Sequence, residues 1–221
     1  IQIIGDMPIY VAADSVEVWT KPELFQLDEE RNPLFVAGVP ADQFSATGQL
    51  WGNPLYAWEE HKKQGYAWWI HRIEESFKIY DVLRIDHFKG FSDYWQVDGK
   101  AEVAKDGSWQ PGPGYDLFKA VKEQLGDLPI IAEDLGNIDD KARKLLTDCN
   151  YPGMKILQFG FEDVSGESLD SPHYCIPHSI VYTGTHDNDV TNGWYNSLTE
   201  QQQQYINDYT HRHEDESICQ A

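Results

Sequence analysis

The stretch DVLRIDHFKGF, residues 81–91, joins a short apolar run to a group of polar side chains. The run VLRI (82–85) is almost continuously apolar, which is typical of a strand buried on both faces of a parallel sheet. Arg84, Asp86 and His87 are costly to bury unless they have partners. We therefore expect a buried strand that presents polar groups together at its carboxyl end.

The same order of an apolar run followed by a helical pattern repeats along the chain. Further near-continuous apolar runs, which predict strands, occupy residues 1–4, 129–132, 154–161 and 180–182. Apolar residues at helical spacing, which predict helices, occupy residues 69–80, 117–125 and 142–149. Gly126 stands where a C-terminal cap belongs, and Thr199 with Gln202 has the pattern of a capping box. Alternation of strand and helix predicts an α/β fold.

Polar side chains directly follow several of these predicted strands. Asp6 follows the first strand, Glu133 follows the third, and His186 and Asp187 follow the fifth. In a (β/α)₈ barrel, catalytic groups come from the carboxyl ends of several parallel strands, which meet at one mouth. We therefore expect the carboxylates of Asp86, Glu133 and Asp187 to converge. The alternative is that they are unrelated surface acids of an acidic protein.

Three carboxylates beside Arg and His fit two chemistries. Asp, Glu and His are common metal ligands, whereas glycoside cleavage uses two carboxyl groups that flank the scissile bond. Arg84 lies two residues before Asp86, so on an extended strand both side chains point to the same side. A guanidinium favours the ionised form of a neighbouring carboxylate, which suits a nucleophile and opposes a metal cation. The pattern favours glycoside chemistry and leaves a metal-dependent barrel hydrolase as an alternative.

The composition narrows the class of partner. The 221 residues include 37 acidic and 17 basic ones, for a formal net charge of −20. This balance argues against nucleic acid and against an anionic membrane surface. Eight Trp and twelve Tyr residues suit sugars, which stack on aromatic rings, although rings also fill protein cores.

The cysteines indicate the expected cellular location, and the first residues indicate whether the chain is a fragment. Cys149, Cys175 and Cys219 have no metal-like spacing and cannot all pair, so a reducing cytoplasm is the expected location. No apolar run approaches the length of a membrane span. The chain starts with IQIIGD rather than Met, and we expect a fragment of a longer protein.

Two stretches interrupt the alternation of strands and helices. Residues 20–60 are rich in Pro, Gly and aromatic residues, and residues 92–114 contain DGSWQPGPGYD. Long loops in a compact domain are usually functional or disordered, and the aromatic content favours ordered functional loops. Trp51 lies in such a Gly- and Pro-punctuated segment, where neither a helix nor a long strand is expected.

The motifs RIDHFKGF, IIAEDLG and YTGTHDND closely resemble those of the 4-α-glucanotransferases of the amylomaltase type, glycoside hydrolase family 77. The stretches IIGDMPIYVAADSVEVW and AGVPADQFSATGQLWGNPLY resemble the same family. The resemblance implies that residues 1–221 are part of a catalytic (β/α)₈ TIM barrel, covering roughly strands 3 to 7. It also implies loop insertions after strands 3 and 4, with residues 20–60 covering the active-site cleft.

The resemblance also implies roles for single residues. Asp86 matches the family nucleophile, Glu133 the general acid/base, and Asp187 the third carboxylate, which stabilises the transition state. The expected substrate contacts are Asp6, Trp51, Arg84, His87 and His186. Residues 38–52 match a loop that covers the cleft. Lys89 stands where an Arg is common in the family.

The implied reaction is transfer of α-1,4-glucan segments between maltodextrins, with retention of configuration through a covalent intermediate. Glucose or a maltodextrin is the acceptor, and no cofactor and no metal are needed. Two alternatives remain. One is an α-glucan hydrolase of the same clan, and the other is an inactive fragment that only binds glucan.

Overall fold

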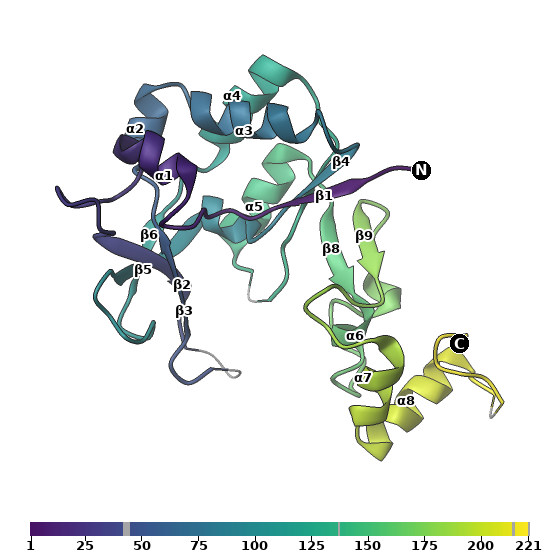
Figure 1. The fold of residues 1–221 in the computed structure, drawn as a ribbon. Helices are drawn as coiled ribbons and strands as arrows, with labels where there is room; N and C mark the ends of the chain where they lie inside the picture. Colours follow the sequence, from purple (N-terminus) through teal and green to yellow (C-terminus); the bar gives the residue numbers. More distant parts are fainter. Residues whose placement is uncertain (42–44, 137, 214, 221) are drawn as a thin grey trace. The chain divides into compact units, whose positions relative to one another are not determined.

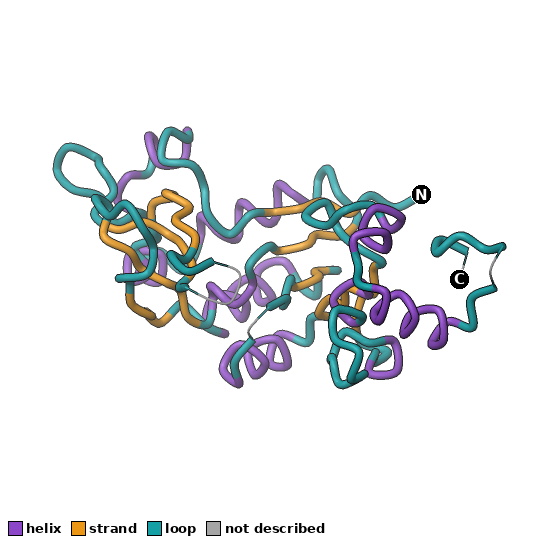
Figure 2. The backbone as a smooth tube through the Cα atoms, turned by 90° about the horizontal axis from the view of Figure 1, so that it is seen from below, coloured by secondary structure: helices purple, strands orange, loops and turns teal. Residues whose placement is uncertain are grey.

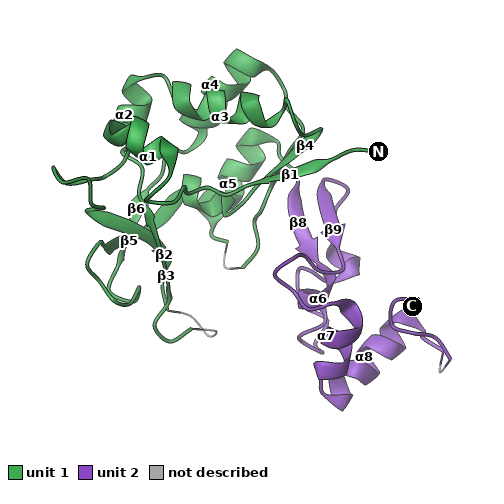
Figure 3. Ribbon diagram, in the orientation of Figure 1, with its two compact units in different colours: residues 1–151 green, residues 152–221 purple. Residues whose placement is uncertain are grey.

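The computed structural model describes residues 1–41, 45–136, 138–213 and 215–220, and its ribbon is drawn in Figure 1. Figure 2 marks helices, strands and loops along the same backbone. The chain divides into two units, residues 1–151 and residues 152–221, which are coloured separately in Figure 3. Each unit is described by itself.

Unit 1 combines a parallel and an antiparallel sheet with helices. Its strands are β1 (Ile4–Met7), β2 (Phe35–Val39), β3 (Gln49–Pro54), β4 (Val82–Ile85), β5 (Asp93–Asp98), β6 (Ser108–Pro111) and β7 (Ile130–Ala132). Its α-helices are α1 (Val16–Thr20), α2 (Trp58–Lys63), α3 (Ala67–Ser76), α4 (Tyr115–Leu125) and α5 (Asp140–Cys149). Two 3₁₀ helices, η1 (Pro22–Leu24) and η2 (Phe88–Phe91), complete it.

The parallel sheet has the order β1-β4-β7, so three of the predicted strands lie side by side. In its register Asp6 is opposite Arg84 and Met7 is opposite Ile85. The carboxyl ends of these strands therefore lie at one edge. The first strand is shifted from the predicted run at residues 1–4, because its pairing with β4 runs from Ile4 to Met7.

The three predicted helical stripes of unit 1 form α3, α4 and α5, and their apolar faces lie in one core with the parallel sheet. The buried members include Trp69 of α3, Phe118 of α4 and Leu145 of α5. The first stripe extended to residue 80, whereas α3 ends at Ser76. Gly126 caps α4 with a φ of 80°, the left-handed region that favours glycine, as the sequence predicts.

The antiparallel sheet has the order β3-β2-β5-β6 and comes from the two stretches expected to be loops. The described residues of these stretches form strands that were not expected from the sequence. Residues 49–54, which include Trp51, form β3 despite Gly52 and Pro54. The strand is exposed at its start and has no alternating apolar pattern, so its pairing with β2 was not visible in the sequence.

Unit 2 contains the parallel pair β8 (Gly153–Ile156) and β9 (Ser179–Tyr182). Its helices are α6 (Leu157–Gly160), η3 (Pro172–Tyr174), α7 (Thr191–Ser197) and α8 (Glu200–Thr210). The apolar run at 154–161 is not one strand, because it turns into α6 at Leu157. The capping box of Thr199 and Gln202 is present at the start of α8, as predicted. Within the described ranges, no helix is long and apolar enough to cross a membrane.

Candidate active site

Arg84 binds two acidic side chains at the carboxyl edge of the parallel sheet. Its side chain is only 9% exposed, and its Nη1 donates to Asp6 Oδ1 at 2.5 Å. Its Nη2 lies 2.9 Å from Asp86 Oδ1. A buried guanidinium is stable when carboxylates accept its N–H groups, and here β1 supplies one and the end of β4 supplies the other. The structure thus brings together three of the predicted site residues.

Asp86 is held through its backbone and leaves its carboxylate accessible. The backbone N–H of Asp86 donates to the carbonyl of Met7 at 3.0 Å, which continues the β1–β4 pairing by one residue. Its side chain is 42% exposed. His87 then takes a left-handed backbone conformation with φ of 49°, where the chain turns from β4 into η2. The strand end is therefore sharply defined, and one Asp86 oxygen faces Arg84.

Glu133 reaches the same strand end from β7. One of its carboxylate oxygens accepts the backbone N–H of His87 at 2.8 Å, and the other accepts the backbone N–H of Leu135 at 2.7 Å. The backbone N–H of Phe88 also donates to the Glu133 carbonyl, at 3.0 Å. The Glu133 side chain is therefore fixed beside the segment that begins with Asp86.

Opposing effects act on the proton affinity of Glu133. Burial raises the pKa of its carboxyl, because the charged form is poorly solvated, and the nearby charge of Asp86 acts in the same direction. The backbone N–H groups of Leu135 and His87, and the charge of Arg84, lower it. The net direction of the pKa is upward from the ordinary value. A carboxyl group of this kind can hold a proton for donation to a leaving group.

An aromatic group lies beside Glu133 and Asp86. The His87 ring stands edge-on to Trp51, with 4.9 Å between ring centroids, and Tyr10 lies 6.2 Å from Trp51. Trp51 is 36% exposed, and its Nε1 donates to Gln49 Oε1 at 3.1 Å. Burial, together with the charge of Lys89, lowers the His87 pKa to about 4, so the imidazole is neutral at pH 7. A neutral ring and a partly exposed indole suit contact with sugar.

Asp187 and His186 follow β9 in unit 2. Both side chains are exposed, and His186 Nε2 lies 3.5 Å from Asp187 Oδ1. The backbone N–H of Asp187 donates to Thr185 Oγ1 at 3.3 Å, in a turn that Asn188 also stabilises. Both residues come after a strand, as expected, but β9 ends at Tyr182, so they lie four and five residues beyond its end. Their convergence with Asp86 and Glu133 stays a prediction.

Some expected parts of the site are only partly described. Residues 42–44 of the expected covering loop at 38–52 lie outside the described residues. Two neighbours of the site, Tyr10 and Lys89, are not predicted site residues. Tyr10 lies in the motif GDMPIYVA, four residues after Asp6, and Lys89 lies in RIDHFKGF, three residues after Asp86. Their positions within motifs that carry catalytic groups were the available signal.

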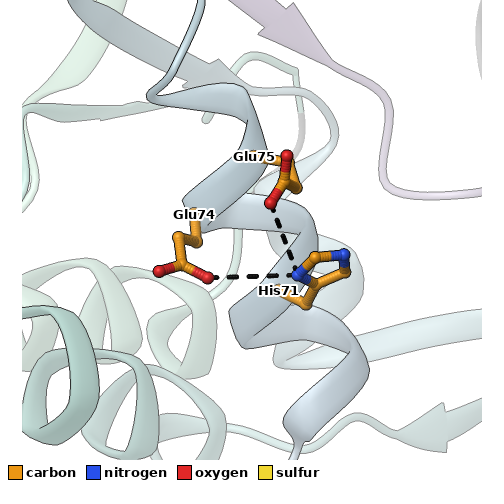
Figure 4. A group of neighbouring side chains, drawn as sticks. All are labelled: His71, Glu74 and Glu75. Carbon is orange, nitrogen blue, oxygen red and sulfur yellow. Dashed lines mark ion pairs between the residues drawn. The ribbon is translucent and has the colours of Figure 1, made fainter.

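One group of side chains in the described part of the chain brings possible metal ligands within 4.8 Å of one another. It consists of His71, Glu74 and Glu75 on α3 (Figure 4). All three are solvent-accessible, with His71 Nδ1 3.9 Å from Glu74 Oε2, and Glu75 also pairs with Lys78 at 2.5 Å. Ion pairs along the exposed face of α3 and with Lys78 just beyond its end explain this arrangement. The group contains none of the carboxylates that follow the strands.

Comparison with known proteins gives a consistent result. The sequence model of a family described as 4-alpha-glucanotransferase matches residues 1–221. The chain is 52% identical to a 4-alpha-glucanotransferase of Streptococcus pneumoniae, over 100% of this chain and 44% of that protein. It is 47% identical to a 4-alpha-glucanotransferase of Thermus thermophilus, over 95% of this chain and 42% of that protein.

A solved structure extends the likeness to the fold. The amylomaltase of Streptococcus agalactiae, solved in complex with acarbose, matches with a TM-score of 0.96 and 60% identity. The match covers 99% of this chain and 44% of that one. The chain therefore spans less than half the length of the relatives that it matches.

Proposed function

The chain belongs to the 4-alpha-glucanotransferases of glycoside hydrolase family 77, and from that membership we propose that the whole protein transfers α-1,4-glucan segments between maltodextrins. The observation that carries this proposal is the cluster at the ends of β1, β4 and β7. There an accessible Asp86 is held by Arg84, and a half-buried Glu133 of raised pKa is held by the His87 backbone.

The proposal includes the place of this chain in a barrel. Residues 1–221 form part of a catalytic (β/α)₈ domain, with β1, β4, β7, β8 and β9 as roughly strands 3 to 7. The stretches 20–60 and 92–114 are insertions after strands 3 and 4, and residues 20–60 cover the active-site cleft. The parallel order β1-β4-β7 and the parallel pair β8-β9 support this arrangement.

In the first step Asp86 is the nucleophile. Its carboxylate oxygen forms a bond to the anomeric carbon of the donor glucan while the glycosidic C–O bond breaks. Glu133 transfers its proton to the departing oxygen, and the donor remains as a covalent ester on Asp86. Arg84, which lies 2.9 Å from Asp86, orients the attacking carboxylate.

In the second step Glu133 acts as a base. It takes the proton from the 4-hydroxyl of an acceptor, which is glucose or a maltodextrin, and that oxygen bonds to the anomeric carbon as the ester to Asp86 breaks. Two inversions retain the configuration. Asp187 is proposed as the third carboxylate, and Asp6, Trp51, Arg84, His87 and His186 are proposed as contacts to the sugar. No cofactor or metal enters these steps.

Transfer requires that an acceptor outcompete water at the covalent intermediate. A covering segment and aromatic platforms such as Trp51 favour the acceptor, because they exclude water and bind sugar. The acidic composition supports a partner that is neither nucleic acid nor membrane. A cytoplasmic location also belongs to the proposal and rests on the cysteine pattern.

The test uses the whole protein with maltotriose as the only substrate. We expect glucose and a ladder of longer maltodextrins by chromatography, with little net gain of reducing ends. An α-glucan hydrolase would instead raise reducing ends in step with the loss of maltotriose. An inactive glucan-binding protein would leave maltotriose unchanged. A metal-dependent hydrolase would lose activity on treatment with a chelator.

A further inference from the structure

Lys89 is a nearly buried cation next to the candidate active site. It lies in η2, three residues after Asp86, and its side chain is 12% exposed. Its Nζ donates to Asp139 Oδ2 at 2.7 Å and, at short range, to Asp93 Oδ1. It also lies 4.4 Å from the centre of the Trp109 ring. The side chain thus has two carboxylates and an aromatic face as its partners.

These partners belong to three other elements of unit 1. Asp93 begins β5, Trp109 lies in β6, and Asp139 is the N-cap of α5, where its Oδ1 accepts the backbone N–H of Ala142. Lys89 therefore connects η2 to the antiparallel sheet on one side and to the start of α5 on the other. The hydrogen bond with Lys89 is also the main reason why the pKa of Asp139 is lowered.

The segment that Lys89 anchors positions the two proposed catalytic carboxyl groups. It begins with Asp86, and the His87 backbone N–H that it contains donates to Glu133 Oε2 at 2.8 Å. The Phe88 backbone N–H donates to the Glu133 carbonyl as well. A shift of η2 would therefore move the nucleophile and release the acid/base together.

We propose that Lys89 is a positioning residue for the transfer reaction: its ion pairs with Asp93 and Asp139 fix η2, and η2 sets Asp86 against Glu133. This inference rests on the proposed function. Lys89 itself is not placed in contact with the sugar. A misplacement of about 1 Å in reacting groups can cost about a hundredfold in rate, so a distant anchor can have a large kinetic effect.

The alternative is that Lys89 only stabilises the fold. Removing one member of a buried ion pair leaves an uncompensated charge, which lowers stability whatever its effect on catalysis. The two roles differ in kcat. A structural role lowers the melting temperature and leaves kcat intact well below it, whereas a positioning role lowers kcat in the folded protein.

The experiment compares variants of the whole protein in maltotriose disproportionation, with kcat, KM and melting temperature measured for each. Lys89→Met removes the charge and keeps the length of the side chain, and Lys89→Arg keeps the charge. Asp139→Asn removes one ion pair and keeps the N-cap, because Asn caps helices as well as Asp does. Lys144→Met is the matched control, since Lys144 forms an exposed ion pair with Asp148 on α5.

We expect Lys89→Met to lower kcat by about tenfold or more with KM changed by less than about twofold, which is the pattern of lost positioning. Lys89→Arg should stay within about threefold of the wild type, and Asp139→Asn should fall between the two. Lys144→Met should match the wild type.

The inference is overturned if folded Lys89→Met keeps its kcat, or if Lys89→Arg loses as much as Lys89→Met. If Lys89→Met does not fold, Asp139→Asn decides, and an unchanged kcat in that variant contradicts the inference. A wild type that makes no transfer products removes the proposed function and this inference together. An active wild type with an equally active Lys89→Met removes only the role of Lys89.

Discussion

The carboxylate of Glu133 accepts the backbone N–H of His87 at 2.8 Å, which joins the end of β7 to the residue directly after Asp86. The two proposed catalytic carboxyl groups are therefore connected through one peptide unit rather than only through side chains. A backbone donor cannot rotate away as a side chain can, so this contact fixes Glu133 with little loss of entropy when substrate binds.

The pH dependence of the reaction should reflect the raised pKa of Glu133. The first step needs its protonated form, and burial is the main cause that raises the pKa above the ordinary 4.5. Glu133 loses its proton as the pH rises through this raised pKa, so kcat/KM should fall on the alkaline side of its profile. The measurement is kcat/KM for maltotriose against pH, and a profile without an alkaline limb would contradict this role for Glu133.

The roles of the two carboxyl groups can be separated with donors of different leaving-group ability. Asp86→Asn removes the nucleophile, so activity should fall by several orders of magnitude with both maltotriose and a maltosyl fluoride donor. Glu133→Gln removes the acid, which fluoride does not need in order to leave. Its first step should therefore be much less impaired with the fluoride than with maltotriose.

Pre-steady-state release of fluoride measures that first step directly. Equal losses with both donors in Glu133→Gln would show that Glu133 is not the acid. Near-normal rates in Asp86→Asn would remove Asp86 as the nucleophile.

The local pattern of the sequence was sufficient for the parallel sheet and the cluster at its edge. The run VLRI is β4 as predicted, and Arg84 does point to the same side as Asp86, because alternate residues of a strand share a face. The helical stripes bury the faces that their periodicity indicates. Each of these elements has a local signature in the sequence, an apolar run or a helical stripe, although the strands that pair lie far apart along the chain.

The antiparallel sheet could not be predicted in the same way. Strand β3 is mostly exposed and shows no apolar period, and the antiparallel pairing of β2 with β5 joins residues about sixty positions apart, which no local pattern specifies. The backbone N–H groups that bind Glu133 also have no residue signature, since any residue supplies a backbone N–H. The ion pairs of Lys89 could not be predicted from the sequence either, because its partners Asp93 and Asp139 come from different elements.

The buried His61 should make the stability of the protein depend on pH. It is 1% exposed, its Nε2 lies 3.1 Å from the Leu24 carbonyl, and burial lowers its pKa from 6.5 to about 4. Below pH 6.5 the unfolded chain binds a proton that the folded chain does not, so stability is lost as the pH falls toward 4. The loss from this group between about pH 7 and about pH 5 is about 2 kcal/mol.

His61→Gln is the comparison, because it removes the titrating group and leaves every carboxylate in place. Its absolute stability will differ, so the quantity to compare is the change in the free energy of urea unfolding between the two pH values. The wild type should lose about 2 kcal/mol more than the variant. Equal losses would mean that His61 is protonated in the folded protein.

The last prediction concerns Trp51, which either anchors β3 or forms a platform for sugar. A deeply buried indole would cost about 3–5 kcal/mol of stability on replacement by Ala. Trp51 is 36% exposed and its ring lies against His87, the residue after Asp86, which favours the platform. Trp51→Ala should therefore change the melting temperature little. It should weaken acceptor binding, so that transfer falls and the hydrolysed share of maltotriose rises.

Trp19→Ala is the matched control, because Trp19 of α1 is 71% exposed and lies outside the proposed site. It should leave both the melting temperature and the ratio of transfer to hydrolysis unchanged, which excludes a general effect of losing an exposed indole. A large fall in melting temperature for Trp51→Ala, with an unchanged ratio, would assign Trp51 to the anchoring of β3. A raised hydrolysed share at normal stability would place its ring against the acceptor, since water would then reach the ester on Asp86 more often than sugar does.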